Sequence, residues 1–191
     1  MTRPMPFSLA DAAPWWRGDP GGRLTIRGGR PLAGTYRISG AKNAVLPLMV
    51  STLLTPHLVT LHNVPASLDV AVLAALLQRL GAGLHWSRAG HGLSLTICAD
   101  QVHPTRIESD LVARMRASVL LLGTLLARCG EASLPMPGGD AIGLRGVDFH
   151  LAGLRAMGAE IDLAGGVIRA TAPRGLRGAE ILLPRPSVGA T

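Results

Sequence analysis

One pattern of predicted elements occurs twice in this chain of 191 residues, and no other feature constrains its fold as strongly. Each copy is predicted to contain an apolar helix, a strand, a second helix and two short strands. The register can be checked, because Leu80-Gly81-Ala82 corresponds to Met157-Gly158-Ala159 at an offset of 77 residues. Thr52-Leu53-Leu54 likewise corresponds to Thr124-Leu125-Leu126 at an offset of 72. Self-similar units of this length are typical of repeat architectures, in which neighbouring units bury one another's apolar faces.

The hydrophobic pattern predicts the bounds of the elements in each copy. The first copy is predicted to contain helices at 44–54 and 68–80 and strands at 58–61, 84–86 and 93–97. The second copy is predicted to contain helices at 116–126 and 147–157 and strands at 132–136, 159–163 and 167–171. The first helix of each copy is apolar on every face, which predicts burial on all sides, whereas the second is amphipathic. Sheets packed around a bundle of buried helices would provide this cover, so we expect an α+β fold.

The remaining segments suggest how the chain is divided. Residues 1–23 are rich in proline and glycine and have no apolar period, which predicts a flexible N-terminal extension. Residues 24–41 alternate apolar and polar side chains across a Gly-Gly-Arg-Pro turn, which predicts a hairpin. We expect this hairpin to pack with a second domain that is missing from this chain. Residues 42–191 are expected to form one domain of two repeats, with a third repeat beginning at Glu180 and cut short at Thr191. We therefore expect a fragment, or a protein whose partner segments lie elsewhere.

Composition favours a soluble protein with a substantial core. Hydrophobic residues make up 48% of the chain and charged residues 16%, so the chain can bury a core and is not disordered. Cys98 and Cys129 lie far apart and form no CxxC pair, which argues against a disulfide framework or a zinc ribbon and favours a reducing cytoplasm. Apolar runs such as 119–122 are too short to span a bilayer, so no membrane segment is expected.

The net charge of +7 favours anionic partners without naming one. Nucleic acid is one candidate, but only six residues are aromatic and no nucleic-acid motif is present, so we expect no nucleic-acid partner. A basic site for a small molecule is at least as compatible with this charge. Lys42 is the single lysine beside 18 arginines, which marks it for attention. The six histidines lack the spacing of metal ligands, so no metal site is expected.

A glycine-rich loop at residues 137–145 separates a predicted strand from a predicted helix. Gly138, Gly139 and Gly143 allow a tight turn that exposes backbone N–H groups, with Asp140 at the tip and Arg145 at the helix start. Such a loop can hold an anion and move a proton, although a plain connection with a solvated Asp has the same composition. It is not a phosphate-binding P-loop, because Leu and Arg stand at 144–145 where Lys and Ser or Thr are required. No G-x-S-x-G motif supports a serine hydrolase.

Five short motifs together carry a resemblance to a known family. They are Ser-Gly-Ala-Lys-Asn at 39–43, Arg-Met-Arg-Ala-Ser at 114–118, Pro-Gly-Gly-Asp-Ala-Ile-Gly at 137–143, Arg-Gly-Val-Asp at 145–148 and Pro-Ser-Val-Gly-Ala-Thr at 186–191. In this order and spacing they resemble the UDP-N-acetylglucosamine 1-carboxyvinyltransferases, which are enolpyruvyl transferases. The resemblance runs from about Leu24 to the C-terminus and covers roughly the first half of the family's usual length. It implies an inverse α/β prism of repeated units, here incomplete, and no cofactor.

The resemblance also implies a reaction. The 3-hydroxyl of UDP-N-acetylglucosamine attacks C2 of phosphoenolpyruvate, C3 is protonated, and phosphate leaves from a tetrahedral adduct, which commits the sugar to peptidoglycan synthesis. Such chemistry needs cations around a carboxylate and a phosphate, an acid near C3 and a base near the hydroxyl. Lys42 and Asn43 match the family's contacts to phosphoenolpyruvate. Arg116 matches an arginine at the substrate site, where a guanidinium can hold an oxyanion bidentately, whereas Arg114 is read as surface charge.

Two further segments match the family's contacts to the nucleotide sugar. The first consists of Arg145, Gly146, Val147, Asp148 and Phe149, although Asp148 could equally be an ordinary carboxylate at a helix start. The second consists of Arg185, Pro186, Ser187 and Val188. The family commonly has Lys where this chain has Arg185, so the charge is kept while the compact geometry is not.

The chain departs from many family members at Asp140, where they carry a cysteine that is the proposed proton donor and the target of the epoxide fosfomycin. A carboxyl group can still deliver a proton if burial or a nearby phosphate raises its pKa, but it lacks the thiolate that the epoxide alkylates. A full-length version is therefore predicted to be active and insensitive to fosfomycin. The catalytic base and further arginines belong to the absent second half, so the isolated chain is predicted to be inactive. The alternatives are a non-catalytic nucleotide-sugar-binding relative, and the sister transferase that acts on shikimate 3-phosphate.

Overall fold

The structure, a computed structural model, describes residues 25, 27–29, 31–89, 92–104, 107, 111–112, 115–138 and 146–190. The first repeat contains α2 (Lys42–Ser51), the 3-10 turn η1 (Thr52–Leu54), β1 (Val59–Val64), α3 (Leu68–Arg79), β2 (Gly83–Ala89) and β3 (Gly92–Cys98). The second contains the 3-10 turn η2 (Arg116–Leu120), α5 (Leu121–Cys129), β4 (Glu131–Pro135), α6 (Asp148–Ala156), β5 (Glu160–Ala164) and β6 (Val167–Thr171). Every helix and strand predicted between residues 44 and 171 is therefore present, with ends shifted by at most a few residues.

The two sheets confirm the internal repeat. Each has three antiparallel strands in the same order, β1-β3-β2 in the first and β4-β6-β5 in the second. The ends of α3 and α6 also agree, because the Ala82 N–H donates to the Leu77 carbonyl and the Ala159 N–H to the Leu154 carbonyl, each at 3.0 Å. The glycines between them, Gly81 and Gly158, have φ angles of 96° and 98°. These are the positions that the offset of 77 residues brings into register.

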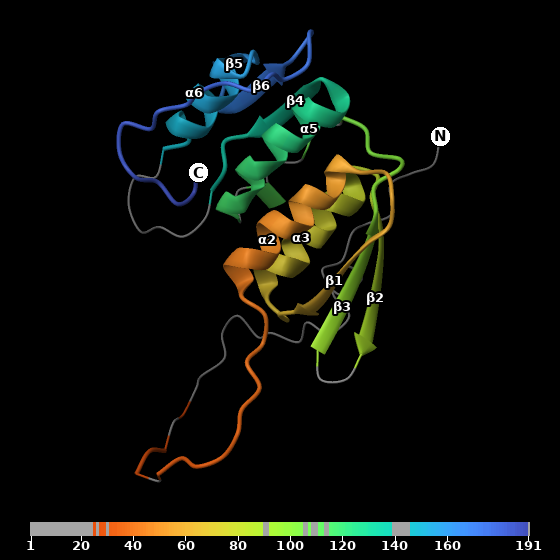
Figure 1. Cartoon of the computed structure of the whole chain (residues 1–191), viewed down its shortest axis with the longest axis vertical. Helices are drawn as coiled ribbons and strands as arrows, with labels where there is room; N and C mark the ends of the chain where they lie inside the picture. Colours follow the sequence, from red (N-terminus) through yellow and green to blue (C-terminus); the bar gives the residue numbers. More distant parts are fainter. Residues whose placement is uncertain are drawn as a thin grey trace.

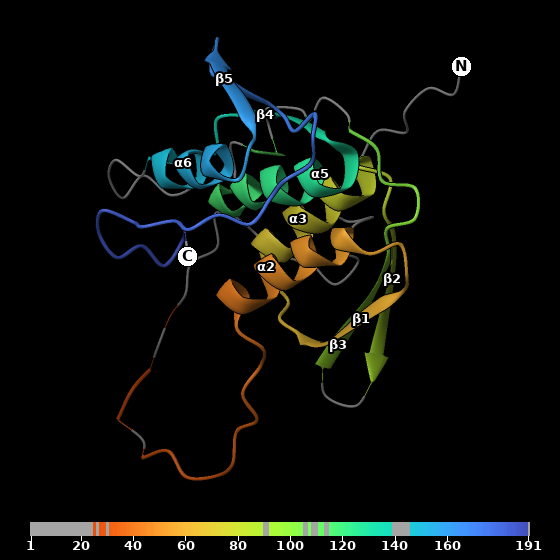
Figure 2. The same ribbon diagram turned by 45° about the horizontal axis from the view of Figure 1, so that its top comes forward.

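The hydrophobic core runs through both repeats without a break. Figures 1 and 2 show α2, α3 and α5 side by side, with the first sheet beside α2 and α3 and the second sheet beside α5. Every residue of α3 from Val70 to Leu77 is buried, so this helix is covered on all sides rather than on the single face that its amphipathic pattern predicted. Alanines 71, 74 and 75 allow this, since their short side chains let neighbouring elements approach closely. None of the helices in the described part of the chain is long and apolar enough to cross a membrane.

The prediction that the helix at 44–54 is buried on all sides is wrong for α2 and η1. Val45, Leu46, Met49 and Val50 are buried, but Leu48 is 52% exposed, and Leu54 of η1 is equally exposed. The helix packs against α3, α5, β1 and η2, which cover one side. A helix that is apolar on every face can be buried on all sides. Whether it is buried depends on how many other elements pack against it. The corresponding prediction for η2 and α5 is closer, because Ala127 is the one residue in them that is exposed.

The hairpin predicted for residues 24–41 is not formed in the described part of that segment. Its described residues contain no strand, and Figure 1 shows them as a long loop that extends away from the body of the molecule. Leu32, Tyr36 and Ile38 are each at least 80% exposed. Two strands alone are marginally stable in water, and these apolar side chains have no surface to pack on here. The predicted packing of this segment on a second domain stays a prediction.

The other boundary predictions remain untested. The N-terminal extension at 1–23 lies outside the described residues. Residues 178–183, where a third repeat was predicted to begin, have no regular structure, and Leu182 is almost fully exposed. The division into an extension, a hairpin and a domain at 42–191 is therefore still an expectation from the sequence.

A bulge in β1 contacts the chain just before α2. The register of β1 against β3 shifts between the pairs Leu61–Leu95 and Val64–Leu93, and Asn63 in between has a φ of 56°. A Cβ placed on Gly40 would lie 2.0 Å from the Asn63 carbonyl oxygen, so only glycine fits at position 40. The bulge thereby fixes the course of the backbone two residues before Lys42.

Candidate functional site

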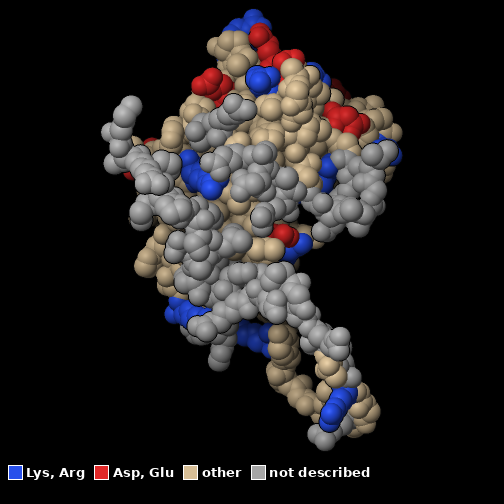
Figure 3. Space-filling view, turned by 180° about the vertical axis from the view of Figure 1, so that it is seen from behind, with Lys and Arg blue, Asp and Glu red and all other residues tan. Residues whose placement is uncertain are grey.

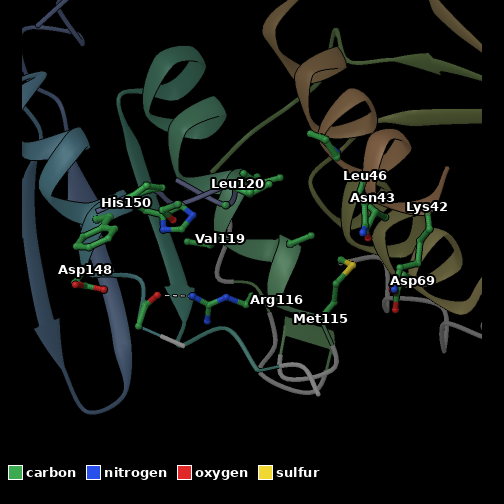
Figure 4. Close-up of a pocket in the computed structure, with 18 of the residues that line it drawn as sticks. Lys42, Asn43, Leu46, Asp69, Met115, Arg116, Val119, Leu120, Asp148 and His150 are labelled. Carbon is green, nitrogen blue, oxygen red and sulfur yellow. Dashed lines mark hydrogen bonds and ion pairs between the residues drawn. The ribbon is translucent and has the colours of Figure 1, made fainter. Parts of the chain in front are cut away.

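A pocket of about 920 Å³ lies between the two repeats, at the N-terminal ends of α2, α3, η2 and α6 and beside the C-terminal segment 185–189 (Figure 4). Its lining is Lys42, Asn43, Leu46, Pro47, Asp69, Met115, Arg116, Ala117, Val119, Leu120, Gly146, Asp148, Phe149, His150, Arg185, Pro186, Ser187, Val188 and Gly189. Most of the residues singled out in the sequence are in this set, although they come from four separate segments. Among the described residues the exception is Val147, while Asp140 and Arg145 lie outside the part of the chain that the structure describes.

Lys42 and Asn43 open α2 at one side of the pocket. The Lys42 ammonium lies 2.6 Å from a carboxylate oxygen of Asp69, and the two side chains are 47% and 29% exposed. Asp69 stands in the first turn of α3, whose N-cap Ser67 accepts a hydrogen bond from the Val70 N–H. The sequence analysis missed Asp69. In the sequence, Asp69 is only an acidic residue two positions after a capping serine. This pattern by itself indicates the start of a helix and nothing more.

Arg116 joins two of the segments that the sequence predicted to bind ligand. It begins η2, and its guanidinium donates a hydrogen bond to the Gly146 carbonyl, which Figure 4 marks with a dashed line. A Cβ on Gly146 would lie 2.5 Å from a carboxylate oxygen of Asp148, so a side chain here would require the Asp148 carboxylate to turn away. Arg116 therefore lies against the start of α6 rather than alone on a surface.

The start of α6 places Asp148, Phe149 and His150 along the opposite side of the pocket (Figure 4). The guanidinium carbon of Arg185 lies 5.4 Å from the centre of the Phe149 ring, within the range of a cation–π contact. Val147 differs from the expectation, since its side chain is buried in the hydrophobic core and does not line the pocket. Its backbone still serves the helix, because its carbonyl accepts from the Leu151 N–H at 3.0 Å.

His150 is a pocket residue that the sequence analysis did not identify. Burial lowers its pKa below the ordinary value of 6.5, and the nearby Arg116 lowers it further, while the Gly189 backbone and Asp148 act in the opposite direction. Its ring also packs against Gly189, where an added Cβ would lie 3.9 Å away. No motif marks a histidine in the first turn of an amphipathic helix, so only its contact with the distant segment 185–189 could have identified it.

The pocket carries more positive than negative side chains. Lys42, Arg116 and Arg185 line it together with two carboxylates, Asp69 and Asp148. The N-terminal ends of α2, α3 and α6 meet there, and each contributes a partial positive charge. On the face shown in Figure 3, acidic and basic groups are intermixed over the second repeat, at the end of the molecule away from the extended segment. The pocket is therefore suited to an anionic ligand.

Two predicted site residues cannot be placed. Asp140, the predicted proton donor, and Arg145, the predicted start of the nucleotide-sugar contact, lie outside the described residues. The segments on both sides of them are described. Gly138 donates through its backbone to the Val112 carbonyl at 3.3 Å, and Gly146 accepts from Arg116. The glycine-rich loop thus begins and ends at positions that are held by the second repeat.

Comparison with known proteins gives consistent results. A UDP-N-acetylglucosamine 1-carboxyvinyltransferase from Rhodospirillum centenum is 51% identical over an aligned length of 178, and the match covers 88% of this chain and 41% of that protein. One from Acidiphilium cryptum is 52% identical, over 88% of this chain and 40% of that protein. The chain thus spans about two fifths of the length of these curated relatives.

Structural comparison agrees. The enolpyruvyl transferase NikO from Streptomyces tendae matches 79% of this chain and 33% of its own, with a TM-score of 0.66 and 27% identity. This match confirms the expected α+β fold of the enolpyruvyl transferases, in incomplete form. The model of the family described as EPSP synthase (3-phosphoshikimate 1-carboxyvinyltransferase) matches residues 26–191. The chain therefore belongs to this family of enolpyruvyl transferases.

Proposed function

We propose that the protein containing this chain transfers the enolpyruvyl group of phosphoenolpyruvate to the 3-hydroxyl of UDP-N-acetylglucosamine, the first committed step of peptidoglycan synthesis in the cytoplasm. The observation that supports this most is the single pocket in which Lys42, Asn43 and Arg116 meet the segments at 146–149 and 185–188. The sequence motifs alone indicate these residues, and the structure brings them together around one pocket. Relatives at about 50% identity bear the name of this activity.

One side of the pocket suits phosphoenolpyruvate. This substrate carries a phosphate and a carboxylate, which require cations and hydrogen-bond donors. The Lys42 ammonium supplies the first and the Asn43 amide the second, and both stand at the N-terminal end of α2, where backbone N–H groups are also open. Arg116 lies between this side and the start of α6. Its position suits an oxyanion shared between the two substrates.

The other side suits the nucleotide sugar. The first turn of α6 and the segment 185–188 line it, and a diphosphate is favoured at such a helix start. The Phe149 ring with Arg185 above it offers a flat surface next to a cation. Ser187 adds a hydroxyl that can donate or accept. Asp148 is proposed as a contact to the sugar nucleotide, although its place in the first turn would also stabilise α6 in the absence of ligand.

In the proposed reaction, the oxygen of the sugar 3-hydroxyl bonds to C2 of phosphoenolpyruvate while a proton passes from Asp140 to C3. The hydroxyl proton goes to a base that this chain does not supply. Phosphate then leaves from C2 while C3 returns a proton to the Asp140 carboxylate, which restores the double bond and the protonated Asp140. Because Asp140 has no thiolate, fosfomycin is expected to leave the enzyme active. Stoichiometric inactivation by fosfomycin during turnover would contradict the role assigned to Asp140.

The test of the proposed function is phosphate release by the protein at its full encoded length. We expect release from phosphoenolpyruvate to depend on UDP-N-acetylglucosamine. The name of the matched family favours one competing acceptor, shikimate 3-phosphate, so this compound is the control. Release with shikimate 3-phosphate alone would overturn the proposal, and binding of UDP-N-acetylglucosamine without any release would indicate a non-catalytic relative. The 191-residue chain by itself is expected to release no phosphate.

A further inference from the structure

The Lys42–Asp69 pair joins one fixed side chain to one adjustable side chain. Asp69 lies in the first turn of α3, which is capped by Ser67 and buried throughout from Val70 to Leu77. Its short side chain has two rotatable bonds and is only 29% exposed. Lys42 is the first residue of α2, has four side-chain torsions and is 47% exposed. The place of the carboxylate is therefore set by the fold, while the place of the ammonium depends on the carboxylate.

The two helix ends act differently on these charges. A carboxylate in the first turn of α3 is favoured by the helix dipole, whereas an ammonium at the first position of α2 is disfavoured by its own helix. No acidic residue in the first turn of α2 offsets this effect. Asp69 supplies the missing negative charge from the neighbouring helix, at an Nζ–Oδ2 distance of 2.6 Å. The pair thus holds a cation where α2 alone would not favour it.

We infer that Asp69 is a positioning residue, which holds the Lys42 ammonium at the phosphoenolpyruvate side of the pocket. The inference rests on the proposed function and names a residue that the sequence motifs did not identify. An ammonium has three N–H donors. The N–H directed at Asp69 restricts where the nitrogen can lie, so that less side-chain freedom is lost when the oxygens of phosphoenolpyruvate bind.

A competing role, in which Asp69 blocks the substrate site, predicts different kinetics. If Asp69 instead occupied the site of the substrate anion, it would have to be displaced, and removing its charge would tighten phosphoenolpyruvate binding. A positioning role predicts the reverse, with weaker binding and slower turnover. Both roles concern phosphoenolpyruvate alone, because Asp69 lies beside Lys42 and Asn43 at the α2 side of the pocket, away from the α6 side (Figure 4).

The experiment is a double-mutant cycle in the protein at its full encoded length, measured by phosphate release. Asp69→Asn keeps the shape of the side chain and removes its charge. We expect kcat/KM for phosphoenolpyruvate to fall about 10-fold or more, as for the loss of a hydrogen bond to a charged group, with KM for UDP-N-acetylglucosamine changed less than about twofold. Adding Asp69→Asn to Lys42→Ala should have little further effect, since the two residues act as a unit. Asp69→Glu should recover part of the loss.

The matched control is Asp162→Asn. This carboxylate pairs with Arg169 at 4.0 Å on an exposed strand outside the pocket, so its removal changes the net charge equally and should leave both KM values unchanged. Equal kinetics of Asp69→Asn and Asp162→Asn would overturn the inference, as would a lower KM for phosphoenolpyruvate in Asp69→Asn. Full additivity of Asp69→Asn and Lys42→Ala would show a general structural role instead. Lack of activity in the wild-type protein would refute the proposed function itself, which distinguishes the two failures.

Discussion

Because the chain contains two copies of the same unit, the loss of folding stability caused by a side chain at a helix end can be compared between them. Gly81 and Gly158 end α3 and α6 with nearly the same backbone, at φ angles of 96° and 98°. Their surroundings differ. A Cβ on Gly81 would lie 2.3 Å from the Gln101 carbonyl oxygen and 2.9 Å from the His103 ring, whereas the nearest atom to a Cβ on Gly158 is 4.0 Å away. Substitution by alanine therefore adds a steric conflict in the first repeat only.

The magnitudes follow from this geometry. An L side chain in the left-handed region costs about 1–2 kcal/mol at either position. The contact with Gln101 is a backbone contact and cannot be relieved by a rotamer change, so Gly81→Ala should lose a further ~1–3 kcal/mol, as in other overpacked sites. The gain from a less flexible unfolded chain is about 0.4–1 kcal/mol for each glycine. Because this gain is the same for both variants, it cancels in their difference.

Equilibrium unfolding in urea measures both losses. We expect Gly158→Ala to lower the free energy of unfolding modestly and Gly81→Ala to lower it by about 1–3 kcal/mol more, with similar slopes against urea concentration. Equal losses in the two variants, or a larger loss in Gly158→Ala, would refute the reasoning. The comparison needs no enzymatic activity, since neither glycine lines the pocket.

Three predictions concern the pocket. Arg116→Lys keeps the charge but removes the forked donor, so calorimetry should show UDP-N-acetylglucosamine binding weakened about 10-fold; unchanged affinity would exclude a direct contact. Phe149→Leu removes the ring beneath Arg185 and should weaken the same binding by about two- to fivefold, as for an exposed cation–π contact, while an Arg185→Lys variant that keeps the cation should lose less. Burial lowers the pKa of His150, so its folded form binds fewer protons than its unfolded form below pH 6.5, and stability is lost as pH falls through that range. Urea unfolding from pH 7.5 to pH 5 should show a smaller loss in His150→Gln than in wild type, and identical profiles would count against this role.

Local periodicity was sufficient to predict most elements of the fold. The strand at 167–171 has the predicted bounds, and the helix at 68–80 differs from α3 by one residue, because alternation and the terminal glycine are encoded within a few residues. The described residues of the segment at 24–41 form no strand, and the predicted full burial of the helix at 44–54 was wrong, because both features depend on what packs against them. Periodicity shows which faces of a helix or strand are apolar. It does not show which other elements pack on those faces.

In the candidate site, too, the sequence identified residues in local motifs but not residues that depend on contacts between distant elements. Lys42, Asn43 and Arg116 stand in motifs with distinctive composition, so the sequence could identify them. Asp69 and His150 stand in ordinary helix starts, and their importance arises only from a partner on another element. A carboxylate near a helix N-terminus is common enough to carry no functional signal. Contacts between elements that are distant in the sequence were therefore the part that required the structure.

The bulge at Asn63 has a consequence for which sequences this fold accepts. Asn63 is held at a positive φ, a region where Asn, Asp and Gly are tolerated and branched residues are not. Gly40 is closed to any side chain, because an added Cβ would lie 2.0 Å from the Asn63 carbonyl oxygen. Two positions that lie 23 residues apart along the chain thus restrict one another. In a saturation library of this protein, variants at 40 and 63 should be depleted together even under selection for folding alone.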